Sequence, residues 1–156
     1  MRALSIRQPF AELILRGVKT VEYRSRPTRI VGERFWIYVP RKLSAVSPER
    51  SAETAKQIWS NDLAVPRPTG GKVGEPPDWL MELAEELILG KLPRGVIVGS
   101  AVVARCELLV PSGIQPTTGN PQLTTPRYAW HLTDVQRAKK MLKPTGHPQP
   151  VWYKPF

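Results

Sequence analysis

Residues 2–24 have the sequence RALSIRQPFAELILRGVKTVEYR, and the spacing of their apolar side chains changes twice along the segment. Residues 2–6 resemble a short strand, and a helix is then expected at about 9–16, ended by Gly17. From residue 19 to residue 24 the side chains alternate, which predicts a second strand. The helix would bury three side chains that recur at helical spacing, Phe10, Leu13 and Ile14.

Beyond this segment the sequence predicts more strands and two further helices. The helices are expected at about 48–59, which is polar, and at 78–90, where Asp78 would cap an apolar stripe that ends at Gly90. The further strands are expected at 35–39, 95–110, 128–132 and 151–153.

Two features interrupt these later strands. Gly99 lies inside the strand at 95–110, where a glycine tolerates a bulge or a tight bend. The basic segment 137–143 and the turn-rich segment 144–150 are expected to separate the last two strands. The alternating strand and helix order of parallel βαβ units is absent. The predicted fold class is therefore α+β, a small mixed β-barrel rather than a doubly wound sheet.

The length of 156 residues fits one domain, which we expect to span 1–156 with a helical insertion at about 45–90. A single cysteine, Cys106, excludes an internal disulfide, and two histidines beside it are too few for the usual zinc sites. No metal or other cofactor is expected. The sequence has no long apolar run and no apolar signal core, so we expect a cytoplasmic protein without a membrane segment.

The formal net charge is +10, and it is distributed unevenly along the chain. Residues 1–50 carry +7, residues 51–100 carry −2 and residues 101–156 carry +5. If the two ends of the chain pair in the fold, their charges would form one electropositive face, as in proteins that neutralise phosphates. A generally basic surface and an acidic small-molecule substrate are alternative explanations.

The segment Gly17–Arg24 contains a charged pattern of its own. The strand period of two places Thr20, Glu22 and Arg24 on one side. Lys19 stands at the first position of the strand, where its side chain can turn into a neighbouring cleft and act as a base or an anion-binding group. The alternative is a surface lysine with an ordinary ion pair at the edge of the sheet.

Four motifs, in the same order, give the whole chain a resemblance to the ASCH (ASC-1 homology) family, a branch of the PUA-like superfamily. The motifs are LSIRQPFA at 4–11, GVKTVEYR at 17–24, LPRGVIVG at 92–99 and YAWHL at 128–132, followed by Trp152. The resemblance implies a PUA-like β-barrel associated with RNA and modified nucleotides. It also implies a cleft bordered by the early helix, the Lys19 strand and the late strands, with nucleic acid as its ligand.

Some short members of this family resemble amidohydrolases that act on N4-acetylcytidine through a Thr-Lys-Glu set. Lys19 matches the lysine of that set, but Glu22 stands at the position of the nucleophilic threonine, and Thr20 directly follows the lysine. A carboxylate does not replace a hydroxyl as the acyl acceptor without forming an anhydride, although Lys19 and Glu22 could activate a water.

The sequence therefore predicts a nucleic-acid-binding protein, most simply an RNA-binding one, with a basic cleft centred on Lys19. The alternative is a metal-independent hydrolase for a modified nucleoside, or a ribonuclease, with Lys19, Glu22 and Thr20 as catalytic residues. A protein partner that docks on the insertion at 45–90 is a third hypothesis. The residues predicted to bind nucleic acid are Ser5, Arg7, Gln8, Lys19, Arg24, Arg26, Arg41, Trp130 and Trp152.

Overall fold

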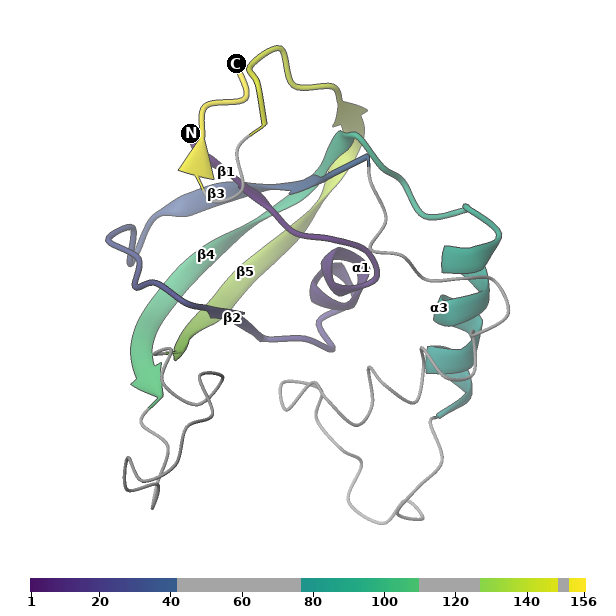
Figure 1. The fold of residues 1–156 in the computed structure, drawn as a ribbon, viewed down its shortest axis with the longest axis horizontal. Coiled ribbons are helices and arrows are strands. Elements are labelled where there is room, and N and C mark those ends of the chain that lie inside the picture. The colour runs from purple at the N-terminus through teal and green to yellow at the C-terminus, as the bar shows by residue number, and fades with distance from the viewer. Residues whose placement is uncertain (42–76, 110–126, 149–151) are drawn as a thin grey trace, which may run out of the picture.

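A computed structural model describes residues 1–41, 77–109, 127–148 and 152–156 (Figure 1). The described residues form six strands and two helices: β1 (Ala3–Ser5), α1 (Phe10–Leu15), β2 (Val21–Arg24), β3 (Arg34–Val39), α3 (Asp78–Ile88), β4 (Val96–Leu109), β5 (Arg127–Leu142) and β6 (Trp152–Tyr153). The strands make one sheet in the order β2-β5-β4-β3-β1-β6. Only β1 and β3 pair in parallel, so the sheet is mixed. The predicted α+β class is confirmed.

The local pattern of the first segment is reproduced closely. The helix expected at about 9–16 is α1, and Gly17 follows it with a φ of 73°, a conformation that glycine adopts without steric cost. The second strand begins two residues later than predicted, at Val21. Lys19 consequently precedes β2, and the period of the strand does not fix the direction of its side chain.

The helix expected at 78–90 is α3, and its apolar stripe is buried as predicted. Leu80, Leu83 and Leu87 have almost no exposed surface and pack with Leu13 of α1. The expected cap by Asp78 is wrong, because Pro77 occupies the N-cap position and Asp78 is already the first helical residue. The helix predicted at about 48–59 lies outside the described residues.

Strand β5 is much longer than predicted. It continues through the basic segment that was expected to separate two strands, and its far end pairs with β4 through Arg137 opposite Gly99 and Leu142 opposite Ile97. Most side chains of this half are exposed, so no apolar alternation marks it in the sequence. Pairing with β4 overrides the weak strand propensity of its lysines.

The bulge predicted at Gly99 is present. The registers of β4 with β3 and with β5 both shift at this position. A Cβ atom built on Gly99 would lie 2.5 Å from the carbonyl oxygen of Gln136 and 2.5 Å from Cδ2 of Leu15. Glycine is therefore required where β4, β5 and α1 meet closely.

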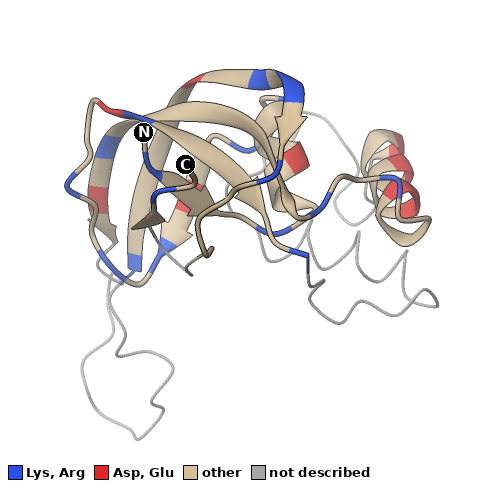
Figure 2. Cartoon of the chain, turned by 90° about the horizontal axis from the view of Figure 1, so that it is seen from above, with Lys and Arg blue, Asp and Glu red and all other residues tan. Residues whose placement is uncertain are grey.

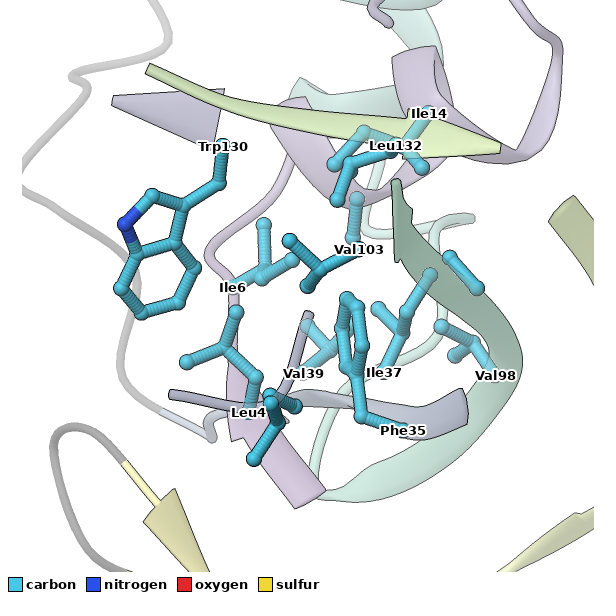
Figure 3. Packing of buried hydrophobic residues seen from close by; sticks show 13 residues of the cluster. Leu4, Ile6, Ile14, Phe35, Ile37, Val39, Val98, Val103, Trp130 and Leu132 are labelled. Atoms are coloured by element: carbon cyan, nitrogen blue, oxygen red, sulfur yellow. The ribbon is translucent and has the colours of Figure 1, made fainter. Parts of the chain in front are cut away.

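The main hydrophobic core lies between the curved sheet and α1 (Figure 3). Trp130 is its largest fully buried side chain and lies beside Leu4 and Ile6. The indole of Trp130 stacks on that of Trp152 at 5.5 Å between ring centroids, with 4° between their planes. A contact between β5 and β6, four places apart in the strand order, shows that the sheet is strongly curled.

The two outer strands of the sheet are β2 and β6, and no ladder joins them within the described residues. The closure of the sheet into a barrel therefore stays a prediction, as does the single-domain organisation. The two ends of the chain do pair, because β1 pairs antiparallel with β6. In the part of the chain described here, no helix is long and apolar enough to span a membrane.

Glu12 fixes α1 to the sheet. Its carboxylate is buried and accepts hydrogen bonds from Arg137 of β5 at 2.7 and 3.1 Å and from Arg16 at 2.9 Å. Arg16 in turn donates to Glu86 of α3 at 2.8 Å. Burial raises the pKa of Glu12, but the hydrogen bonds and charges of Arg137 and Arg16 outweigh it, and the pKa is lower than its ordinary value of 4.5.

Replacing Glu12 with glutamine is expected to lower the free energy of unfolding by about 1–3 kcal/mol at neutral pH, the scale of hydrogen bonds to charged groups. Because the folded-state pKa is depressed, the ionised Glu12 stabilises the fold above pH 4.5 and this contribution is lost as the pH falls through the folded pKa. Urea denaturation of both proteins across acidic pH measures the difference. If the difference in the free energy of unfolding between the two proteins is the same at every pH, the proposed role of the ionised Glu12 is contradicted.

Candidate functional site

The backbone around Lys19 is held by the end of α1. The amide nitrogens of Val18 and Lys19 both donate to the carbonyl oxygen of Leu13, at 3.0 and 3.1 Å. The Lys19 side chain is only 4% exposed. It is therefore not the solvated surface lysine that was one of the two sequence-based alternatives.

One carboxylate and two aromatic rings lie around the buried ammonium of Lys19. Its Nζ lies 3.8 Å from Oε2 of Glu22. It is 5.5 Å from the ring centroid of Phe10 and 5.3 Å from that of Tyr23, within the range of cation–π contacts. The helix α1 and the strand β2 thus place two rings and one carboxylate around a single cation.

Arg24 extends this group of charges to the first strand. Its Nε lies 3.1 Å from Oε1 of Glu22, and its Nη2 donates to the carbonyl oxygen of Ser5 at 2.8 Å. Its Cζ lies 5.9 Å from the ring centroid of Trp130. We call Lys19, Glu22 and Arg24, with the rings of Phe10 and Tyr23, the Lys19 cluster. It carries two cations and one anion, hence an excess of one positive charge.

Lys19 is buried and Glu22 and Arg24 are half-buried, and burying charged side chains is costly unless each has a partner. In the Lys19 cluster the single carboxylate of Glu22 serves both cations, one on each oxygen. The charges of Lys19, Glu22 and Arg24 sum to one positive charge, which attracts a second anion. The cluster is therefore suited to a ligand with a phosphate, a carboxylate or a developing oxyanion.

Three exposed arginines were predicted beside Lys19, and the structure places them on separate segments. Arg7 is exposed on the segment between β1 and α1, and Arg26 is exposed just after β2. Arg41 is exposed after β3, and its side chain packs against Gly95. Figure 2 shows Lys and Arg spread over the sheet and its connections, and it shows Asp and Glu both on α3 and on other parts of the chain.

Two of the predicted binding residues have structural positions instead. Trp130 is 0% exposed, so it offers no surface on which a base could stack. Its Nε1 donates to the carbonyl oxygen of Arg26 at 3.2 Å. Gln8 is buried, where its Oε1 accepts from the amide of Glu12 and its Nε2 donates to the carbonyl oxygen of Pro93. Trp130 thus packs against Arg24 of the Lys19 cluster, and Gln8 joins the start of α1 to the segment before β4.

The predicted hydroxyl, Thr20, does not share the burial of Lys19. Thr20 is exposed, although its neighbour Lys19 is buried, and its carbonyl oxygen accepts from the amide of Leu132. His131 forms a 2.8 Å hydrogen bond with Glu107. Across the described ranges, no group of three or more His, Cys, Asp or Glu residues is arranged to hold a metal ion.

The sequence analysis did not assign the rings of Phe10 and Tyr23 to the site. Phe10 was expected in the core because of its helical spacing, and Tyr23 lies within the strand predicted at 19–24. The sequence did contain a signal for these two rings, namely their positions before and after Lys19. When a strand follows a helix directly, the chain reverses and the strand runs back past the start of the helix. The sequence does not specify how closely the strand approaches the helix.

The family model of the ASCH domain matches residues 4–140. No curated protein matches it.

Proposed function

The chain belongs to the ASCH domain family, and on this basis we propose that it binds RNA at the surface around the Lys19 cluster. ASCH domains are associated with RNA binding. The observation that carries the proposal is the burial of Lys19 between two aromatic rings and beside the carboxylate of Glu22, which also pairs with Arg24. A fold gains little stability from such a buried set of charges, so the arrangement is better explained by a ligand.

RNA matches the chemistry of this surface in two ways. Its phosphates are attracted by the excess charge of the Lys19 cluster and by the exposed side chains of Arg7 and Arg26. An unpaired base can stack on an aromatic ring, and the half-buried rings of Tyr23 and Trp152 retain some exposed surface. The proposal includes the closed barrel and the cleft that the family resemblance implies.

Salt dependence tests the electrostatic part of the proposal. For single-stranded RNA, the slope of log affinity against log salt falls by about 0.7 for each lost phosphate contact. The Arg7→Gln/Arg26→Gln double variant should reduce the slope by about 1.4 and weaken binding equally across sequences. The control Arg2→Gln/Lys154→Gln removes two exposed cations beside β1 and β6 and should leave the slope unchanged. Wild-type affinity that is independent of salt would contradict the proposal.

A metal-independent hydrolase is the second candidate, supported by the 3.8 Å approach of Lys19 Nζ to Glu22 Oε2. Such a pair can exchange a proton with a water that attacks an acyl or phosphoryl group. Thr20 was the predicted hydroxyl for this chemistry, and its exposed position does not favour it as the acyl acceptor. Release of acetate from N4-acetylcytidine by the wild-type protein would establish this activity. A protein partner at the 45–90 insertion stays a prediction.

A further inference from the structure

The C-terminal half of β5 carries a second basic surface. Residues 137–143 include four Lys or Arg and no Asp or Glu. Arg137 is bound to Glu12, but Lys139, Lys140 and Lys143 are exposed. Among the described residues, none of these three lysines takes part in an ion pair. Figure 2 shows blue segments near the end of this strand.

Two of these lysines, Lys139 and Lys140, lie in a large irregularity of β5. Between the pairs Gly99 with Arg137 and Ile97 with Leu142, β5 advances five residues while β4 advances two. Residues 138–141 of β5 therefore lie opposite Val98 alone, and this bulge-like irregularity contains Lys139 and Lys140. Bulges reorient the side chains they carry and are common beside functional sites.

This basic surface is distinct from the Lys19 cluster. β2 pairs with β5 only along Tyr128–His131, near the beginning of β5. Lys139 follows His131 by eight residues, which corresponds to about 25 Å along an extended strand. A nucleic acid bound at the Lys19 cluster would have to extend along β5 to reach the bulge.

We propose that Lys139 and Lys140 form a second phosphate-binding surface, which the backbone of a longer RNA strand contacts while another part of it occupies the Lys19 cluster. This inference rests on the proposed RNA binding. Lysine is suited to this task because its point charge contacts phosphates without reading the sequence. Lysines also protect exposed strand edges against aggregation, and the experiment separates that role from RNA binding.

The experiment compares oligouridines of about 4 and about 16 nucleotides, the range of site sizes for small single-strand-binding folds. The wild-type protein should bind the longer strand more tightly. Lys139→Gln/Lys140→Gln should weaken binding of the longer strand about tenfold, reduce its salt slope by about 1.4 and leave the short strand unaffected. The Arg2→Gln/Lys154→Gln control should bind both strands as the wild-type protein does.

Each other outcome overturns this inference in a recognisable way. If the wild-type protein binds the short strand but gains nothing from the longer one, or if the lysine variant binds both normally, the second surface is refuted and the proposed function stands. If the wild-type protein binds neither strand, the proposed function itself fails. Loss of binding to anionic vesicles in the lysine variant, with RNA binding intact, would assign the lysines to a membrane surface instead.

Discussion

Replacing Trp130 with alanine is expected to lower the free energy of unfolding by about 3–5 kcal/mol, the largest loss of stability that we predict for a single substitution in this chain. Trp130 is completely buried, and its ring stacks on Trp152. Arg24 covers the ring, and its indole nitrogen is hydrogen bonded to the backbone at Arg26. Urea denaturation measures the loss, and Trp36→Ala, at a half-buried position, should cost less.

The Trp130→Phe variant separates stability from RNA binding. It keeps an aromatic ring in the core and loses the hydrogen bond to Arg26, so it should remain folded with a smaller loss of stability. Because Trp130 has no exposed surface, RNA affinity should not change in the folded variant. A selective loss of RNA affinity would instead make Trp130 a stacking platform. It would also require the core to open when RNA binds.

The early part of the fold was predictable because its signals are local. The apolar spacing of α1 and the glycine that ends it lie within a few residues of each other. The same holds for α3, whose stripe of leucines fixes the buried face. Gly99 was also found from its surroundings, since a glycine inside a run of valines leaves few explanations other than a bulge.

The second half of β5 was not predictable from local signals. Its residues are mostly exposed, and lysines disfavour strands in isolation. What makes it a strand is β4, which precedes it by a long connection in the sequence and supplies the pairing partners. The spacing of apolar residues predicts a helix or strand by showing which of its faces is buried. It cannot predict a strand whose two faces are both exposed.

The charged residues of the candidate site were predictable from the sequence, but the burial of their side chains was not. Lys19, Glu22 and Arg24 were all named from one short motif, and the structure brings them together. The strand period did not place Lys19, because β2 begins after it. The burial of this lysine depends on Phe10, which α1 brings back beside β2. The same dependence on packing explains why Trp130 was expected to face a ligand and is found in the core.

Replacing Lys19 with methionine is expected to weaken RNA binding by about 1–3 kcal/mol, or about 5- to 150-fold. Methionine keeps an unbranched apolar stem between the rings of Phe10 and Tyr23, so packing is largely retained. Glu22 keeps its ion pair with Arg24 and is not left as an unpaired buried charge. The substitution therefore removes one cation from the Lys19 cluster and changes its net charge from +1 to 0. Fluorescence anisotropy with labelled single-stranded RNA measures the affinity.

The matched control is Lys91→Met, which removes the same charge from an exposed position just after α3 and should leave RNA affinity unchanged. Urea denaturation of both variants identifies any contribution from misfolding. If the protein is a hydrolase, Lys19→Met should abolish turnover of N4-acetylcytidine while substrate affinity changes little, because the cation then acts on the transition state rather than on the bound ligand. A folded Lys19→Met protein with wild-type RNA affinity and wild-type turnover would show that Lys19 lies outside the functional site, and that its burial only fastens β2 to α1.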